Sequence, residues 1–293
     1  MQRKLVKQGK GALTLSLPKK WLDSHNLEAG DEMNIDEETH SLTLSTTKKK
    51  ATTKSINITL EEGSFNSFRS ILGGLYRGGY DQIKVTYKTP KAITLLQKAV
   101  DSLYGFEIFD IDEKSCTIKG IYQEEVPEIE SYVRKSIHTI KVMQDMIEED
   151  LQKKKYDSKK EIFQLRNNVL KQRDLIIRII VQNKLLEKET FPYYQISVNL
   201  WNIARNYYNL YDSLDKVSNK KIEYFKETNK MFTKFFYSIN KDEPLDIHKQ
   251  YRNLSNKGKE LMKTKEASLF ISYCLNILMS IQSSNSSVLL INL

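Results

Sequence analysis

The spacing of hydrophobic positions divides this chain of 293 residues into three parts. In residues 1–47, short alternating runs predict strands around one short helix. In residues 55–123, alternating runs and helical stripes take turns, which predicts a small α/β unit. In residues 126–285, apolar residues recur every three or four positions, which predicts helices throughout. The pattern therefore predicts a multidomain α+β protein with a long, all-helical C-terminal part.

Residues 1–47 are predicted to form a small β-rich fold that begins with two strands. Apolar and polar residues alternate over Leu13–Leu17, as they do in a half-buried strand. Gly9 and Gly11 predict a turn between this strand and an earlier one at Leu5–Lys7. The turn would place Lys10 at its tip.

A short helix and two further strands complete the small fold. Pro18 suits the first position of a helix that runs to about His25, because the missing N–H of proline costs nothing there. Alternation predicts one strand at Met33–Ile35 and another at Leu42–Leu44. So few large apolar side chains make a weak core for a single copy, and the segment has no cysteine. We therefore expect a homodimer through this N-terminal domain.

Charge is sorted along the same 47 residues. The first 20 residues carry six Lys or Arg and no acid, and the next 27 carry seven acids and no Lys or Arg. Clustered cations attract duplex DNA because they release its condensed counterions, so we expect double-stranded DNA as a partner. Only arginine offers the planar fork that reads guanine, so phosphate contacts should dominate. The six cations are Arg3, Lys4, Lys7, Lys10, Lys19 and Lys20.

A lysine-rich linker at 48–54 leads to the middle unit. Its lysines either add non-specific DNA affinity or keep the linker solvated. The element order over residues 55–123 is β-α-β-α-β-β, which predicts a ferredoxin-like or related α/β domain. A phosphate-binding loop precedes a helix, but the pairs Gly73-Gly74 and Gly78-Gly79 do not. The second pair is predicted to end a helix. A small-ligand sensor role for this unit is an alternative.

Six helices are predicted in residues 126–285. The clearest apolar repeat runs from Ile196 to Val217 with alternating spacings of four and three, which is typical of antiparallel bundles. Pro192 and Pro244 are predicted to lie in connections between helices. The six helices divide into two groups of three, a weak internal duplication. We interpret the Lys-rich composition of this part as a solvated helical surface.

The motifs of the first two parts resemble known families. Residues 1–47 resemble the AbrB/SpoVT swapped-hairpin DNA-binding domain. The resemblance lies in a basic strand and a glycine turn, followed in order by T-L-S-L-P-K-K-W, L-E-A-G-D-E-M-N-I and S-L-T-L. The segment L-G-G-L-Y-R-G-G-Y-D-Q-I-K-V, followed by two helical triplets, resembles the archaeal PhoU-like phosphate-uptake regulators. The resemblance implies an interlocked dimer that meets DNA through its first strand and loop. By position, it makes Arg3, Lys4, Lys7 and Lys10 the candidate DNA-binding residues, with Lys19 and Lys20 at the helix start as second-rank candidates. It also implies a PhoU-like six-helix domain and phosphate-transport genes as targets.

The chain departs from the PhoU family where metal ligands would fall. That family binds metal through acidic stations, and a cationic or amide side chain cannot replace a carboxylate there. The corresponding neighbourhoods here hold Arg166, Asn167, Asn168, Leu170 and Arg205. We therefore expect no metal and no other cofactor, and a metalloprotein is a weaker alternative.

Other candidate chemistry is sparse. The four histidines show no metal-ligand spacing and no nucleophile motif occurs, so we expect no catalytic residues and no enzyme. Asp145 and Glu149 are interpreted as part of a solvated helix face. Cys116 and Cys274 form no CxxC pair, which favours a reducing compartment. Without a signal sequence or an apolar run long enough to span a bilayer, we expect a cytoplasmic protein that does not insert into membranes.

Two functional hypotheses follow from these features. The first is a DNA-binding transcriptional regulator, in which the helical part acts as a sensor or partner platform. The second is an adaptor, in which the helical part binds a phosphate transporter or a signalling protein such as a sensor kinase. In the second case residues 1–47 serve chiefly to dimerise the chain.

Overall fold

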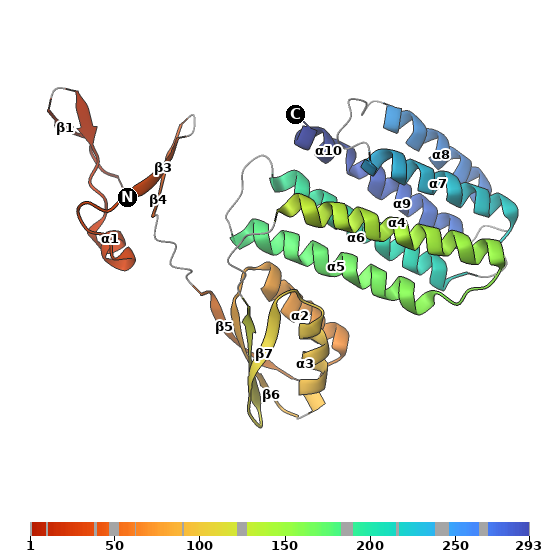
Figure 1. Cartoon of the computed structure of the whole chain (residues 1–293), viewed down its shortest axis with the longest axis horizontal. Coiled ribbons are helices and arrows are strands. Elements are labelled where there is room, and N and C mark those ends of the chain that lie inside the picture. The colour runs from red at the N-terminus through yellow and green to blue at the C-terminus, as the bar shows by residue number, and fades with distance from the viewer. Residues whose placement is uncertain are drawn as a thin grey trace. The chain divides into compact units, whose positions relative to one another are not determined.

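The computed structural model of the chain describes residues 2–9, 11–37, 40–46, 53–61, 63–89, 91–121, 128–182, 190–214, 217–237, 246–263 and 269–292. The chain forms two compact units, called here unit 1 (Met1–Thr53) and unit 2 (Lys54–Leu293). Small β-sheets occupy the N-terminal part and helices the C-terminal part (Figure 1). The predicted mixed α+β class with a helical C-terminal region is therefore confirmed.

Unit 1 contains two antiparallel pairs of strands. β1 (Val6–Gln8) pairs with β2 (Ala12–Thr14), and β3 (Met33–Glu37) pairs with β4 (Leu42–Thr46). All four strands lie where the hydrophobic alternation predicts them. The second strand is shorter than predicted, because pairing with β1 ends at Thr14.

The helix α1 (Lys19–His25) links the two strand pairs along the chain. Pro18 precedes the helix with an extended ψ of 123°, so it is the N-cap rather than the first helical residue. Asn26 ends the helix with a left-handed φ of 50°. The ring of His25 lies 4.6 Å from that of Trp21, and its Nδ1 lies 2.8 Å from the Trp21 carbonyl oxygen. The predicted helix bounds are thus correct to one residue.

Unit 2 begins with a four-stranded sheet and two helices that lie on the same face of it (Figure 1). In chain order the elements are β5 (Ser55–Leu60), α2 (Phe65–Arg77), β6 (Gln82–Tyr87), α3 (Lys91–Asp101), β7 (Phe106–Ile111) and β8 (Ser115–Gly120). The strand order is β5-β6-β8-β7, with β5 and β6 parallel and the other neighbours antiparallel. The predicted element order is confirmed. The ferredoxin-like assignment is wrong, because that fold follows the order β-α-β-β-α-β.

The core of this sheet follows directly from the sequence pattern. In β6, Ile83 and Val85 are buried, whereas the alternate side chains are exposed, as expected for a strand with one covered face. The side chain of Ser64 caps α2 by accepting a hydrogen bond from the backbone N–H of Ser67 at 3.3 Å. The helix ends before Gly79, which has a φ of 77°, so the predicted glycine stop is confirmed.

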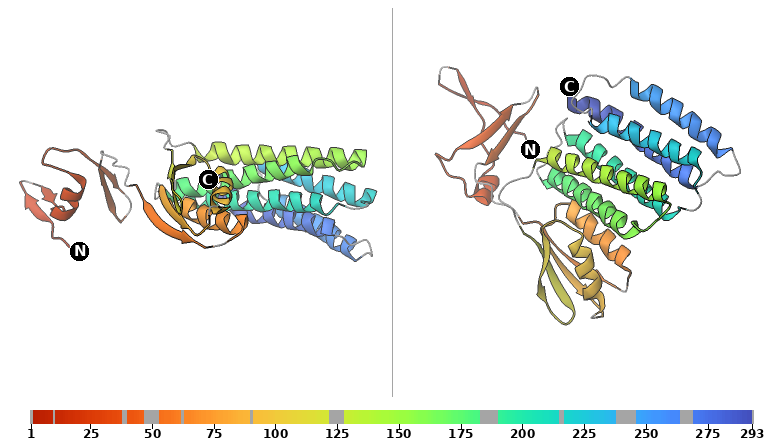
Figure 2. Two further views of the ribbon diagram at one scale, coloured as in Figure 1. Left: turned by 90° about the horizontal axis from the view of Figure 1, so that it is seen from below. Right: turned by 45° about the vertical axis from the view of Figure 1, so that its right-hand side comes forward.

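The remainder of unit 2 is helical and forms a bundle (Figure 2). The described helices are α4 (Ile129–Lys153), α5 (Lys159–Gln182), α6 (Thr190–Asp212), α7 (Asn219–Tyr237), α8 (Asp246–Met262), α9 (Leu269–Ser283) and α10 (Asn285–Asn292). The helix α10, which follows a turn at Ser284, was not predicted. Pro192 lies in the first turn of α6 and not in a connection, because proline is tolerated there. Pro244 lies outside the described residues.

Contacts group the long helices into two triplets around one core. α4, α5 and α6 contact one another, α7, α8 and α9 contact one another, and α6 and α9 pack across the two groups. A buried polar chain runs through this core. The Gln144 amide donates to the Tyr207 hydroxyl, which donates to Asn229, both at 2.8 Å. Burial raises the pKa of Tyr207 well above its usual value.

The sheet part and the bundle meet where α5 packs on α2. Arg178 of α5 is buried and donates to the carbonyl oxygens of Tyr76 and Tyr80 at 2.8 and 2.7 Å. It also pairs with the buried carboxylate of Asp81 at 2.6 Å. Leu175 of the same helix packs on the hydrophobic core of the sheet. These contacts fix α5 to the sheet part and couple the two cores of unit 2.

One segment in the described part of the chain, Leu269–Ile291, has the length and hydropathy of a membrane-spanning helix, with a mean hydropathy of 1.3. The sequence analysis did not identify it. In the structure 44% of this apolar window is buried inside the molecule. Ile271, Cys274 and Ile277 of the segment are fully buried in the bundle core.

Candidate nucleic-acid interface

The first group of predicted DNA-binding residues lies on β1 and the segment that precedes it. Arg3 and Lys4 lie in the segment before β1, and Lys7 lies in β1, where it pairs with Leu13 of β2. All three basic side chains are exposed. Lys10 lies outside the described residues. Lys7 lies four residues after Arg3, so the three cations are spread along the chain; they are called here the basic row.

The turn between β1 and β2 has the backbone that the glycines predict. Gly9 has a φ of 67° and Gly11 a φ of 144°, conformations that residues with a Cβ rarely adopt. The hydroxyl of Thr14 donates to the carbonyl oxygen of Val6 at 3.2 Å and ties the two strands together.

The second group, Lys19 and Lys20, forms the first turn of α1, and both side chains are exposed. The N-terminus of a helix carries partial positive charge, so two lysines there cost free energy, typically about 0.3–1 kcal/mol each. Helix stability therefore does not account for their position. In the described residues, no hydrogen bond or ion pair joins this group to the row on β1.

The five described basic residues of unit 1 have no carboxylate within 4.0 Å among the residues that the structure describes. The acids of unit 1 lie in α1, the loop after it and β3. One of them, Asp31, accepts a hydrogen bond from the backbone N–H of Glu28 at 2.9 Å. Because no described carboxylate neutralises these five cations, their charge is available to an external anion.

The apolar residues of unit 1 do not form a core in a single copy. No described residue of this unit is buried. The most exposed of its large apolar side chains are Leu42 at 66%, Leu5, Leu13 and Ile35 at 62% each, and Val6 at 61%. Exposed apolar side chains concentrated in so short a segment are typical of a surface that another chain covers.

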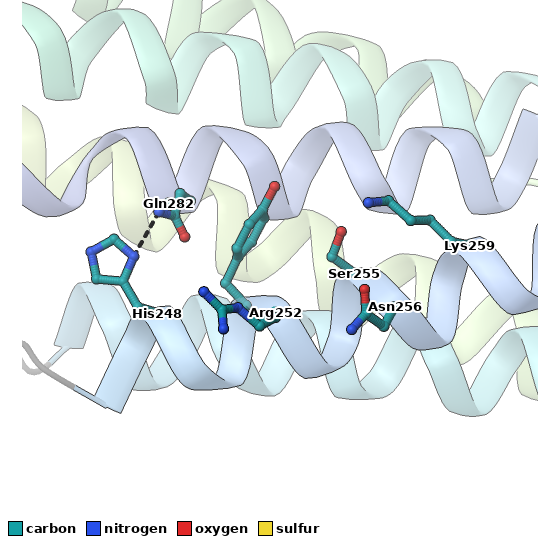
Figure 3. Close-up of a pocket in the computed structure, with 7 residues that line it drawn as sticks. His248, Arg252, Ser255, Asn256, Lys259 and Gln282 are labelled. Atoms are coloured by element: carbon teal, nitrogen blue, oxygen red, sulfur yellow. Dashed lines mark hydrogen bonds between the residues drawn. The ribbon is translucent and has the colours of Figure 1, made fainter.

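Unit 2 has a second basic feature, a pocket of about 220 Å³ between α8 and α9. Figure 3 shows His248, Arg252 and Lys259 along one face of α8, opposite Gln282 of α9. His248 Nδ1 lies 2.8 Å from Gln282 Nε2. The three basic residues are exposed to solvent. The sequence analysis missed this pocket. The available signal was the spacing of His248, Arg252 and Lys259 at positions i, i+4 and i+11, which places three basic residues on one face of a helix.

A buried arginine cluster on the α2–α5 contact was also missed. The Asp174 carboxylate is fully buried and pairs with Arg69 at 2.5 Å, Arg77 at 2.9 Å and Arg173 at 2.6 Å. Burial raises the pKa of Asp174, but the arginines lower it by more, so the net pKa lies below its usual value. A Cβ at Gly73 would lie 2.2 Å from Arg69 Nη1, so this glycine leaves the space that Arg69 occupies.

Metal-ligating groups are not assembled in the described part of the chain. No group of three or more His, Cys, Asp or Glu side chains capable of holding a metal ion occurs there. Asp145 and Glu149 form exposed ion pairs with Lys141 and Lys153 on α4, so their interpretation as a solvated face is confirmed. Arg166, one of the residues that replace acidic ligands in the sequence comparison with PhoU proteins, lies against aromatic rings.

Both cysteines, Cys116 and Cys274, are buried free thiols. Burial raises the pKa of Cys116 to about 11 and raises that of Cys274 further above its usual value. A thiol with so high a pKa carries almost no thiolate at neutral pH, and the thiolate is the nucleophile. Neither cysteine is therefore suited to nucleophilic chemistry.

Comparisons with known proteins identify no relative of this chain. No family model matches it, and neither a curated protein nor a solved structure matches it significantly.

Proposed function

We propose that this protein is a dimeric DNA-binding transcriptional regulator in which residues 1–47 hold duplex DNA. The observation that carries the proposal is that the described cations of unit 1 are exposed and have no carboxylate partner among the described residues. The motif resemblance to AbrB/SpoVT domains supports the same assignment. The resemblance of the chain to PhoU-like regulators of phosphate uptake supports a role for the helices of unit 2 as a sensor or as a platform for protein partners.

The exposed apolar residues of unit 1 support a homodimer. Without a core, a segment of this size is not expected to be stable alone. A second copy would cover residues such as Leu13 and Leu42, which are 62% and 66% exposed. Dimerisation would also double the number of cations that face one duplex, because each copy brings its own basic row.

The proposal predicts a strong dependence of DNA affinity on salt. For B-DNA, the logarithm of the binding constant falls with the logarithm of salt concentration with a slope of about −0.9 for each phosphate neutralised. Arg3, Lys4, Lys7 and Lys10 of two copies offer eight such contacts. Their contribution to the slope is therefore at most about −7.

The test is fluorescence anisotropy of a labelled duplex from the protein's own promoter region, titrated with the full-length chain at several salt concentrations. We expect tight binding with a steep slope. Replacing Arg3, Lys4, Lys7 and Lys10 with alanine should weaken binding and flatten the slope.

A matched control removes the same charge from elsewhere. Lys135, Lys160, Lys220 and Lys230 are exposed on the helices of unit 2, and their replacement with alanine also lowers the net charge by four. We expect this variant to bind DNA almost as the parent does. Equal losses in the two variants would show that binding follows net charge alone and would remove the site from residues 1–47.

A pocket in the bundle supports the adaptor as a second candidate function. Between α4, α6, α7 and α10 lies a pocket of about 330 Å³, lined in part by Val133, Ile137, Ile196 and Phe236. An apolar pocket of this size can accept a hydrophobic side chain from a protein partner. An adaptor would bind a phosphate transporter or sensor kinase through unit 2 and would not bind DNA. Retention of the partner by a chain lacking residues 1–47, together with no DNA binding by the full chain, would favour this function.

A further inference from the structure

Arg166 of α5 places its guanidinium group among three aromatic rings. Its Cζ lies 5.0 Å from the ring centre of Trp201, 5.2 Å from that of Phe163 and 5.3 Å from that of Tyr208. Aromatic rings attract the guanidinium through their faces, but they do not satisfy its N–H donors as oxygen atoms do. Contacts with the rings therefore leave the hydrogen-bonding capacity of Arg166 largely unused.

The charge of Arg166 is also unpaired within the described residues. Its Nε is buried and has no hydrogen-bond partner. The pKa of Arg166 lies below its ordinary value, chiefly because burial disfavours the charged form. Tyr208 raises this pKa, and the neighbouring cation Arg205 lowers it further. A partly buried cation that lacks an oxygen partner is costly, so native structures usually supply one.

Neither of the two helices that form this surface supplies the missing oxygen. The described acids of α5 and α6 are Glu161, Asp174 and Asp212. Asp174 is already bound by three arginines, and Asp212 pairs with Lys159. Glu161 is exposed and stands five residues before Arg166, on a different face of α5.

The surplus of positive charge extends beyond Arg166. Trp201 also lies under the guanidinium of Arg173, at 5.4 Å, which connects Arg166 to the cluster around Asp174. Arg69, Arg77 and Arg173 already share the Asp174 carboxylate. Arg166 shares the Trp201 ring with Arg173, and Arg205 is a neighbouring cation of Arg166, so positive charge exceeds negative charge on this surface.

We propose that Arg166 and Arg205 bind a phosphoryl oxyanion on the α5–α6 surface, beside Trp201 and Tyr208. The planar guanidinium fork matches the oxygen spacing of a phosphoryl group and donates two parallel hydrogen bonds to it. A phosphoryl group brings up to two negative charges, which the local excess favours over a single carboxylate. The aromatic rings hold Arg166 in place, so little side-chain freedom is lost on binding.

This site differs from the basic pocket between α8 and α9. There His248, Arg252 and Lys259 are exposed, so water solvates their charges (Figure 3). Arg166, in contrast, is only partly exposed and lies among aromatic rings that offer no oxygen acceptor, so water solvates its guanidinium group less well. The α5–α6 surface therefore has the stronger physical need for a bound oxygen anion.

Trp201 makes the proposal directly measurable. The chain has two tryptophans, so a full-length Trp21→Phe variant reports Trp201 alone. Its fluorescence is recorded while inorganic phosphate is added to about 10 mM at constant ionic strength, a range that detects millimolar or tighter binding. We expect a saturable change. Adenosine monophosphate is titrated in parallel, and the tighter ligand shows whether free phosphate or a phosphate ester is the source.

Three variants locate the binding in the same background. Arg166→Gln and Arg205→Gln should each weaken binding by about tenfold or more, because each removes a charge-assisted hydrogen bond. Arg205 is exposed, so its replacement leaves the fold intact. Arg252→Gln, in the other basic pocket, should bind as the parent does.

Several results would overturn the proposal. They are the absence of saturation by both ligands, unchanged affinity in both Arg166→Gln and Arg205→Gln, or loss of binding in Arg252→Gln. Saturation by a short DNA duplex but by neither small ligand would assign the surface to nucleic acid instead. The titrations with phosphate and adenosine monophosphate contain no DNA and report on unit 2. Their outcome is therefore independent of whether residues 1–47 bind DNA.

Discussion

Replacement of Asp174 with asparagine tests how unit 2 joins its sheet to its helices. The Asp174 carboxylate is fully buried on α5. It pairs with Arg69 and Arg77 of α2 and with Arg173 of its own helix, at 2.5, 2.9 and 2.6 Å. The variant keeps the size of the side chain but leaves three arginines without their shared counter-charge.

The expected cost follows from burial. Removing one partner of a buried ion pair typically costs about 3–5 kcal/mol, because the remaining charge stays desolvated. The side chains of Arg69 and Arg173 are only 11% and 15% exposed, but that of Arg77 is 31% exposed and can regain water. We therefore expect Asp174→Asn to lower the free energy of unfolding by about 3 kcal/mol, the low end of this range.

The assay is thermal unfolding of the full chain at pH 7, followed by far-UV circular dichroism and by Trp201 fluorescence in a Trp21→Phe background. For a domain of 150–250 residues, 1 kcal/mol corresponds to about 2–4 °C, so we expect Tm to fall by roughly 6–12 °C. Glu61→Gln is the control. It breaks an exposed pair with Lys88, whose side chain is 62% exposed, and should change stability by less than about 1 kcal/mol.

The same variant carries a pH signature. The net pKa of Asp174 lies below its ordinary value of 3.8, so the ionised carboxylate stabilises the folded chain above that pH. This stabilisation is lost as pH falls through the lower pKa of the folded state. The Tm difference between parent and Asp174→Asn should thus be full at pH 7 and shrink below about pH 3.8. A Tm of the variant within the error of the parent at pH 7 would refute the reasoning.

Two further predictions concern the bundle and the sheet. Gly258→Ala should destabilise unit 2 by about 1–3 kcal/mol, because the added Cβ would lie 2.2 Å from the hydroxyl oxygen of Tyr224; urea unfolding measures the loss, and an unchanged midpoint would contradict it. Cys116 and Cys274 should resist a thiol reagent such as DTNB at pH 8 in the native chain and react fully in denaturant, because both are buried with raised pKa values. Rapid native labelling of either thiol would show that the region around it opens readily.

Local patterns were sufficient to predict every described element except α10, and their order. Alternation located the strands of unit 1 and the strand Gln82–Tyr87, because side chains of a strand alternate between a covered and an open face. Stripes at spacings of three and four located the long helices for the equivalent reason. The predicted stop at Gly78-Gly79 was correct, since glycine adopts positive φ without strain.

The errors arose where local preference leaves more than one solution. The element order β-α-β-α-β-β is compatible with several sheets, and only strand pairing shows that β5 lies beside β6 in parallel. Proline can follow the end of one helix or lie in the first turn of the next, and Pro192 lies in the first turn of α6. The candidate DNA-binding residues were predicted from charge and from the resemblance to AbrB/SpoVT domains. The structure adds that five of them, Arg3, Lys4, Lys7, Lys19 and Lys20, are exposed.

The sequence by itself determined the helices, the strands and the sorted charge of residues 1–47, because these depend on residues close to one another in the chain. Only the tertiary structure decided which distant charges meet. Asp174 pairs with arginines 97 and 105 positions away, and Arg166 finds Trp201 on the neighbouring helix. No periodicity encodes such contacts, since they depend on the relative placement of packed helices. The basic row of unit 1 can therefore be recognised by counting charges along the sequence. The arginine-rich α5–α6 surface can be recognised only from the structure, which shows that Arg166 has no carboxylate partner among the described residues.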